Sequence, residues 1–279
     1  MEAWTLNNPI FESDNDFDAV RKSYWTGHRW FAYDLVNFIK PTLIVELGVD
    51  RGVSFFAFCQ AVKDFQLKTD LVGIDMWHVE GSDLGDNIFA LVRNITRQYY
   101  KVVSPRLVRN DFLKVVNEFD DGSIDILHID GDHAYDSVRK DYETWIRKVG
   151  KNGIILFHDV AAYAQEGSLR FWSEIKLTAP YFEFQNSAGL GVLFPKGDLC
   201  YQRMIKHNFI DKIKIYEYRS EAQVAMQADL SWQKQQTNKW WEAYQKMKQH
   251  YKRVKSDLSW QRLQTEKWWR EAIDNRKQN

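Results

Sequence analysis

The sequence predicts an α/β fold in which a seven-stranded, largely parallel sheet closes in an antiparallel hairpin and is followed by a long helical tail. Three observations support this prediction. Short apolar runs alternate with helical stretches of about 10–15 residues, which is the pattern of consecutive βαβ units. Two apolar runs near residue 190 flank a short turn that contains glycine, which is typical of a hairpin. Neither proline nor glycine occurs between residues 198 and 279, so one helix can continue through the tail.

The elements follow in order from residue 16. Apolar residues recur near helical spacing over 16–39, which predicts a helix that Pro41 ends. Short apolar runs then predict strands at 43–47, 71–75, 106–108, 124–130, 153–158, 181–185 and 189–194. The stretches between them predict helices at 54–63, 87–100, 112–119, 135–149 and 168–178. We therefore expect a helical segment at 1–40, an α/β domain at 41–200 and a helical tail at 201–279.

The tail contains an internal repeat. The segment at 229–241 reads DLSWQKQQTNKWW and returns at 257–269 as DLSWQRLQTEKWW, after a shift of 28 residues. Since 28 residues are four heptads, equivalent residues fall on one stripe of a supercoiled helix. That stripe comprises Leu230, Gln233, Thr237, Trp240, Tyr244, Met247, Tyr251, Val254, Leu258, Gln261, Thr265 and Trp268. The repeat predicts a coiled coil that joins subunits, and the alternative is a basic, tryptophan-rich helix at a membrane surface.

Composition restricts the class of protein. Lys and Arg balance Asp and Glu at 38 each, but from residue 229 onward twelve basic residues face six acidic ones, so the rest of the chain is net acidic. A net-acidic body argues against a nucleic-acid-binding enzyme. No apolar stretch is long enough to span a membrane, and the acidic, polar first 20 residues do not resemble a secretory signal. Cys59 and Cys200 lie in apolar contexts, as buried reduced thiols do. These features predict a cytoplasmic protein.

Two predicted strands end in side chains that can bind metals or move protons. The segment SIDILHIDGDHAYDSV at 123–138 delivers Asp130, Asp132 and His133, and NGIILFHDV at 152–160 delivers His158 and Asp159. Ligands of open α/β sheets bind at the carboxyl ends of the strands. Asp132 and Asp159 could instead cap the following helices, but capping does not explain the accompanying histidines. We therefore predict a functional site at this sheet edge, with His128, which lies within its strand, as a core residue.

The first two strands predict the nucleoside side of the site. In VELGVDRGVSF, Glu46 closes the first strand, and Gly48 and Gly52 let the backbone approach a ligand beside a helix N-terminus. This spacing is not the GxGxxG of a dinucleotide site. Asp75 ends the second strand, where an acid can accept hydrogen bonds from a ribose diol. Asp111 follows the third strand and either flanks an adenine or caps the next helix.

These segments together resemble the class I S-adenosylmethionine-dependent methyltransferases, and within them a bacterial group associated with sugar and polysaccharide biosynthesis. The resemblance covers about residues 20–197 and rests on Gly27-His28, VELGVDRG, IDMW, SIDILHIDGDHAYDSVRKDYETW, NGIILFHDV and SAGLGVLF. It implies a Rossmann-like fold, with S-adenosylmethionine bound by Glu46, Gly48, Gly52, Asp75, Trp77, Asp111 and Asp130. The chain departs from the group after Trp77, where HVEGSDLGD replaces a Gly-Asp-x-His-x-Gly run, so the resemblance does not carry over to the acceptor.

The resemblance also implies a reaction. Transfer of a methyl group to a hydroxyl oxygen requires alignment and removal of the hydroxyl proton. In metal-dependent relatives a cation such as Mg²⁺ sits on the acids that close the fourth and fifth strands, which map to Asp130 and Asp159, with His158 in place of an acid. A purely histidine-driven mechanism is the alternative. His133 is the candidate general base, with Asp130 beside it in the catalytic group.

The resemblance thus implies an O-methyltransferase that acts on a hydroxyl of a sugar or glycan. Two alternatives have other functions: a non-catalytic scaffold in a glycan-assembly complex, and a cephalosporin-hydroxylase-like enzyme on the same fold. The expected partners are a glycan acceptor and further copies of the chain, with no nucleic acid. If the tryptophan-rich tail contacts a membrane, the protein is expected at the inner face of that membrane.

Overall fold

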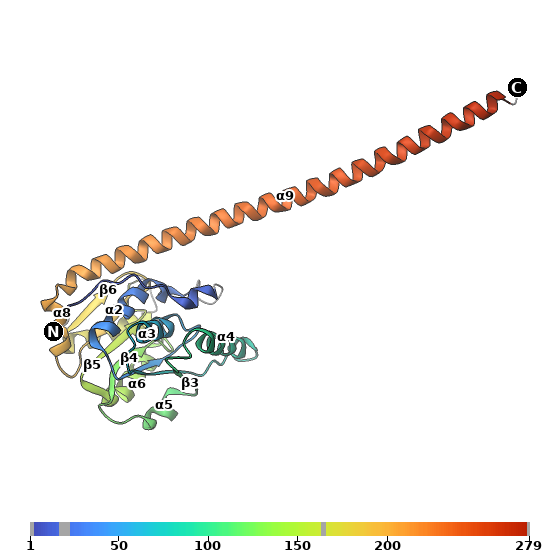
Figure 1. The fold of residues 1–279 in the computed structure, drawn as a ribbon. Coiled ribbons are helices and arrows are strands. Elements are labelled where there is room, and N and C mark those ends of the chain that lie inside the picture. The colour runs from blue at the N-terminus through green and yellow to red at the C-terminus, as the bar shows by residue number, and fades with distance from the viewer. Residues whose placement is uncertain (1–2, 17–22, 163–165, 278–279) are drawn as a thin grey trace. The chain divides into compact units, whose positions relative to one another are not determined.

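The computed structural model describes residues 3–16, 23–162 and 166–277 and divides the chain into two compact units, Met1–Gln223 and Val224–Asn279. The first unit is a sheet covered by helices, and the second is the distal part of one long helix (Figure 1).

The sheet confirms the predicted α/β architecture. Its seven strands are ordered β3-β2-β1-β4-β5-β7-β6. Strands β1 to β5 pair in parallel, and β7 is antiparallel to both β5 and β6, as the hairpin prediction requires. The strands are β1 Leu43–Leu47, β2 Asp70–Asp75, β3 Arg106–Arg109, β4 Ile124–Ile129, β5 Val149–His158, β6 Tyr181–Phe184 and β7 Leu190–Leu193.

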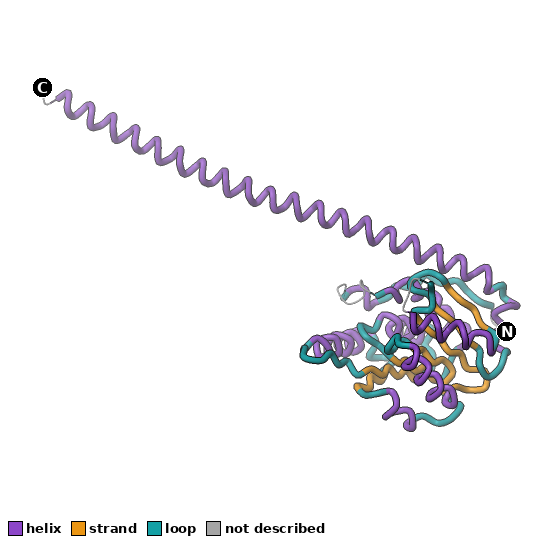
Figure 2. The backbone as a smooth tube through the Cα atoms, turned by 180° about the vertical axis from the view of Figure 1, so that it is seen from behind, coloured by secondary structure: helices purple, strands orange, loops and turns teal. Residues whose placement is uncertain are grey.

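Helices lie on both faces of this sheet (Figure 2). The α-helices are α2 Arg29–Ile39, α3 Val53–Asp64, α4 Leu84–Tyr99, α5 Phe112–Val115, α6 Tyr135–Trp145, α7 Glu166–Ile175, α8 Leu199–Lys206 and α9 Phe209–Lys277. The 3-10 helices are η1 Glu12–Asn15, η2 Tyr24–His28, η3 Val116–Glu118, η4 Ile146–Lys148 and η5 Lys176–Thr178. Because strand side chains alternate between faces, Ile44 of β1 joins the core under α2, α3 and α4, whereas Val45 joins the core under α6 and α7.

The prediction of one continuous helix over 16–39 is wrong at 24–28, where the chain forms a 3-10 helix. Residues 17–22 lie outside the described residues, and the chain then forms the tight turns of η2 before α2 begins. The Ser23 hydroxyl accepts a hydrogen bond from the backbone N–H of Trp25 at 3.1 Å and so starts a turn there. Gly27 lies so close to the hydroxyls of Ser187 and Ser220 that a Cβ atom would be 2.0–2.1 Å from them. Tertiary contacts therefore override the helical periodicity of this segment.

Three predicted helix ends also change. The helix expected at 135–149 ends its α-helical part at Trp145, because Val149 pairs with Ile124 and opens β5. A register shift between Ile124 and Ile126 accommodates this earlier start of the strand. The helix expected at 112–119 is one α-turn followed by a 3-10 turn, and α4 begins three residues before the predicted start at 87.

The predicted long helix is present and spans 69 residues as α9. Its first turns belong to the first unit, where Phe209, Tyr216 and Ser220 are buried. The coiled coil remains a prediction. None of the helices in the described residues combines the length and the hydropathy that crossing a bilayer requires.

Candidate active site

A cavity of about 570 Å³ opens at the carboxyl ends of β1, β2, β4 and β5, where the sequence places the functional edge. Eight of the residues singled out from the sequence line it: Gly48, Asp75, Asp111, Asp130, Asp132, His133, His158 and Asp159. Glu46, Gly52 and Trp77 are not part of the described lining, although all three lie in the loops and strands that form it. Tyr24, which no sequence motif indicates, also lines the cavity.

Gly48 brings two strand ends together. Its φ of +91° lies in the region that favours glycine, and an added Cβ would stand 2.0 Å from the carbonyl oxygen of Asp130. The Asp130 backbone N–H donates to the Leu47 carbonyl at 2.8 Å, so β1 and β4 remain hydrogen-bonded up to their carboxyl ends. The glycine therefore sets the distance between the predicted nucleoside loop and the acid of β4.

Asp75 organises the turn after β1. One carboxylate oxygen accepts hydrogen bonds from the backbone N–H groups of Val49 and Asp50, both at 2.9 Å, and the other accepts from that of Trp77 at 2.7 Å. The Trp77 indole N–H donates to the Asp50 carbonyl at 2.9 Å. The Trp77 side chain therefore holds the turn after β1 in place. Asp75 lines the cavity, and its hydrogen bonds fix the orientation of both carboxylate oxygens.

Glu46 lies behind the cavity, in full burial. The register of β1 and β4 places it beside His128, whose Nδ1 is 3.2 Å from a Glu46 oxygen, and the Ser54 hydroxyl donates to the same oxygen. The Trp25 indole N–H donates to Nε2 of His128 at 3.0 Å. Nε2 is therefore the acceptor nitrogen, and the Nδ1 hydrogen faces Glu46. Burial raises the pKa of Glu46. His128 is a core residue, as expected.

The acids and histidines of β4 and β5 form one cluster. Nε2 of His133 lies 3.0 Å from Asp159 and 3.6 Å from Asp130, and Nδ1 of His158 lies 3.4 Å from Asp130 and 3.5 Å from Asp159. Asp159 has a φ of 58°, an unusual conformation for a residue with a Cβ, and it aims its carboxylate at both rings.

Attraction between the carboxylates and the imidazole rings sets the protonation state of this cluster. The two carboxylates raise the pKa of His133 to about 10. Burial lowers the pKa of His158, but the same carboxylates outweigh burial and raise it to about 10. Burial raises the pKa of Asp159, yet the two imidazoles bring it down to about 2, and they hold that of Asp130 well below its usual range. At neutral pH the cluster is therefore two carboxylates beside two imidazolium rings.

A backbone carbonyl orients the His158 ring through Nε2, the nitrogen that does not face the acids. Nε2 of His158 lies 3.0 Å from the Ser187 carbonyl oxygen, and Nε2 of His28 lies 3.2 Å from the same oxygen. Ser187 and Ala188 both have positive φ, so the turn between β6 and β7 presents this carbonyl inward. The sequence predicts a hairpin turn at 186–189, within a segment that also carries the family resemblance, but gives its backbone no role in the site. Nothing in the residue types there signals that its carbonyl aims a histidine.

Two acids act as caps. Asp111 accepts from the backbone N–H of Leu113 at 2.8 Å as the N-cap of α5, which is the alternative left open for it, although it also lines the cavity. Asp132 accepts from the Ser137 hydroxyl at 2.6 Å and from the backbone N–H of Ala134 at 3.3 Å. Asp132 therefore stabilises the start of α6.

Three groups can hold a cation together. Asp130, His133 and Asp159 each offer one ligand atom, and these atoms lie within 4.8 Å of one another. Two carboxylates suit Mg²⁺ or Mn²⁺, whereas an imidazole favours softer transition metals. The donor set therefore fits a divalent cation. His133 replaces His158 in this three-atom group, although Nδ1 of His158 also faces both acids.

Comparison with known proteins shows which sequences this chain resembles. Residues 45–160 match the family model described as a methyltransferase domain. An uncharacterized protein, y4gI of Sinorhizobium fredii, is 35% identical over 192 residues, which are 68% of this chain and 21% of that protein. This chain thus spans about a fifth of the length of that relative.

A solved structure shares the fold. The crystal structure of a putative caffeoyl-CoA O-methyltransferase from Staphylococcus aureus matches with a TM-score of 0.53 at 15% identity, covering 68% of this chain and 93% of that one. The family model spans strands β2 to β5, whereas β6 and β7 lie beyond its last matched residue. Residues 45–160 are therefore similar to methyltransferase domains, and the sheet that contains them shares its fold with that solved structure.

Proposed function

We propose that this chain transfers the methyl group of S-adenosylmethionine to a hydroxyl oxygen of a sugar or glycan, with a divalent cation assisting. The observation that carries the proposal is the pairing of His133 with Asp159 at 3.0 Å on the wall of the cavity. A methyl acceptor of low acidity needs such a base within reach. The proposal further assigns Asp75 and the Gly48 turn to the cofactor.

The reaction exchanges one bond for another. The methyl–sulfur bond of the sulfonium breaks as the methyl–oxygen bond forms, S-adenosylhomocysteine leaves, and the hydroxyl proton passes to His133. In neutral His133 the Nε2 hydrogen faces Asp159, so the lone pair is on Nδ1, and Asp159 stabilises the imidazolium that forms. A divalent cation on Asp130 and Asp159 would supply positive charge that lowers the pKa of His133 towards neutrality and makes the acceptor hydroxyl more acidic.

The cavity supports a sugar acceptor through its mixed lining. Tyr24 and Met76 both line the cavity, and they are 73% and 54% exposed. An open aromatic face offers a surface for the C–H face of a sugar ring, while Asp50 and Ser23 provide polar partners for its hydroxyls. Incubation with S-adenosylmethionine and a panel of nucleotide sugars or lipid-linked glycans, followed by mass spectrometry, tests the proposal. A gain of one methyl group on a free hydroxyl is expected.

The first prediction concerns the cofactor. Replacing Asp75 with asparagine should weaken S-adenosylmethionine binding by about 1–3 kcal/mol. Both Asp75 oxygens accept from backbone N–H groups, so either orientation of an asparagine amide sets a donor against a donor. Isothermal titration calorimetry measures the effect. Asp70→Asn, at the exposed start of β2, is the matched control. Equal affinities for Asp75→Asn and the wild type would contradict this cofactor site.

The second prediction concerns the cation. Excess EDTA should abolish most activity, and Mg²⁺ or Mn²⁺ should restore it. Because both carboxylates raise the pKa of His133 to about 10, the residual rate in EDTA should climb with pH towards 10, whereas the metal-loaded rate should reach its plateau at lower pH. Steady-state rates between pH 6 and pH 10.5 measure both profiles. Full activity in EDTA would remove the cation from the mechanism and leave the base in place.

A further inference from the structure

The distal helix exposes a line of large apolar side chains. Trp240 is 76% exposed, Tyr244 46%, Met247 62% and Leu258 60% in the single chain. Helices in proteins gain most of their stability from packing an apolar face, and contiguous exposed apolar surface marks an interaction site. The described residues of this unit, 224–277, form one helix, so their side chains have no second element of that unit to pack against.

The 28-residue repeat shows which geometry would cover this line. At 3.6 residues per turn, 28 residues rotate a straight helix about 80° away from alignment, so the two copies of the repeat would face different directions. At the 3.5 residues per turn of a left-handed coiled coil, 28 residues complete eight turns, and Leu230 and Leu258 share one side. On a flat membrane, a straight helix would turn the two copies of the repeat in different directions, so only one copy could face the membrane. A supercoiled partner helix would contact both copies on the same side.

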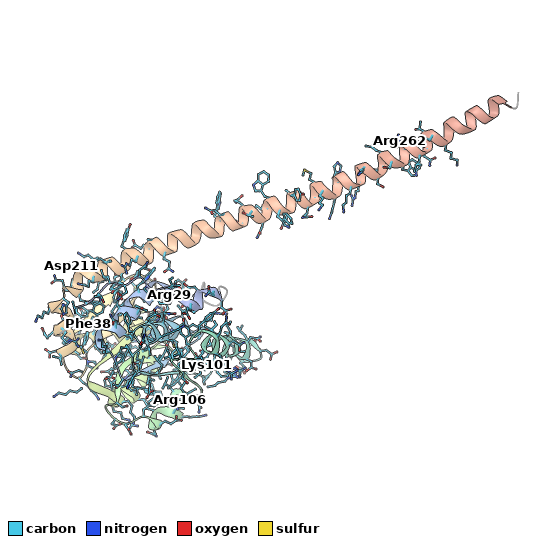
Figure 3. All side chains as sticks on the ribbon, viewed as in Figure 1. Arg29, Phe38, Lys101, Arg106, Asp211 and Arg262 are labelled. Atoms are coloured by element: carbon cyan, nitrogen blue, oxygen red, sulfur yellow. The ribbon has the colours of Figure 1, made fainter. Side chains whose placement is uncertain are left out.

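Charges fix the direction of that partner. With Leu258 at heptad position a, Asp257 is at g and Arg262 is at e, which is the spacing that pairs g of one helix with e of a parallel partner. The first copy of the repeat carries the same acid-to-base spacing in its sequence. Lys248 and Lys255 are also at e, so an antiparallel arrangement, which sets e against e, would oppose like charges. Figure 3 shows the Arg262 side chain on α9.

Polar residues within the seam are accommodated by the helix itself. The Thr237 hydroxyl donates to the Gln233 carbonyl at 3.0 Å, and the Thr265 hydroxyl donates to the Gln261 carbonyl at 2.9 Å. Each threonine hydroxyl is thus satisfied within its own helix, and its methyl group remains to pack against a neighbour. We propose that residues 224–277 pair with the same segment of a second copy of this chain in a parallel, in-register coiled coil.

Cysteine cross-linking of the full-length protein tests the pairing. Leu258→Cys lies at position a and Leu263→Cys at position f, and the two leucines are almost equally exposed in the single chain, at 60% and 63%. The native Cys59 and Cys200 are buried. Mild oxidation should convert most of the Leu258→Cys protein to a covalent dimer, and should leave Leu263→Cys and the wild type uncross-linked. Equal cross-linking at both positions, or none at 258 in a protein that is still oligomeric, would overturn the parallel register.

Solution mass and charge reversal complete the test. Light scattering should give twice the chain mass, which Leu258→Asp lowers and Leu263→Asp does not. Asp257→Arg should weaken association at least threefold, and Asp257→Arg combined with Arg262→Asp should restore it. A monomeric wild type would overturn the proposal. If such a monomer bound phosphatidylglycerol vesicles but not phosphatidylcholine vesicles, the tryptophan-rich helix would be a membrane contact.

Discussion

Replacing His133 with alanine is expected to lower turnover by about 10²- to 10⁴-fold while leaving S-adenosylmethionine affinity nearly unchanged. His133 is the only histidine among the described residues that both lines the cavity and lies within 3.0 Å of a carboxylate. Asp75 and the Gly48 turn, which are assigned to the cofactor, make no described contact with its ring. Single-turnover rates and calorimetry separate the chemical step from binding.

The control for this variant is His78→Ala. His78 lines the same cavity but does not belong to the acid–histidine cluster, so its removal should change turnover far less. Exogenous imidazole should partly rescue His133→Ala if the residue is a base. If His133 is a cation ligand instead, rescue should come from raised Mn²⁺ concentration. Turnover within a few-fold of the wild type in His133→Ala would contradict both roles.

The sequence predicts the chemical composition of this site well, because its signals are local. Asp130 and Asp159 each end an apolar run, and parallel strands bring their carboxyl ends to one edge of a sheet. Gly48 marks a turn that only a residue without a Cβ can make. These features depend on a few neighbouring residues and on a general rule of topology, so they can be read without coordinates.

The contacts that orient the site depend on pairing over long distances in the chain. Glu46 seemed to be a cofactor ligand from its place at the end of β1, but the register with β4 sets it beside His128, 82 positions away, and burial closes around both. Ser187 aims His158 through a backbone carbonyl, which carries no residue-specific signal. Helix ends such as Trp145 shifted for the same reason, since the competing strand pairing of Val149 lies elsewhere in the sequence.

Replacing Asp130 with asparagine is expected to destabilise the fold and to make the loss depend on pH. The Asp130 carboxylate faces His158 at 3.4 Å, His133 at 3.6 Å and His128 at 4.0 Å, and its side chain is only 18% exposed. Removal of one partner of a buried ion pair leaves the other charge uncompensated, which costs about 3–5 kcal/mol in free energy of unfolding. The same change removes a carboxylate that holds His133, so turnover should fall as well.

The sign of the pH dependence follows from the two pKa shifts. The pKa of His158 is raised to about 10, so its stabilisation is fully present below the unfolded value of about 6.5 and is lost as pH rises through 10. The pKa of Asp130 is lowered, so the stabilisation from its carboxylate is present above about pH 4 and is lost only as pH falls further. The wild type should therefore exceed Asp130→Asn in stability most strongly between about pH 4 and pH 6.5, and the difference should shrink towards pH 10.

Urea unfolding at pH 5.5 and pH 9.5 measures this difference, and NMR titration of the imidazole signals should show the pKa of His158 falling, because burial lowers it once only Asp159 remains. Asp136→Asn, which removes an exposed acid from the first turn of α6, should change stability by about 0.5 kcal/mol or less at either pH. A loss of stability in Asp130→Asn that is equal at both pH values would mean that packing dominates. The charged cluster between β4 and β5 would then contribute chemistry to the site and little to the fold.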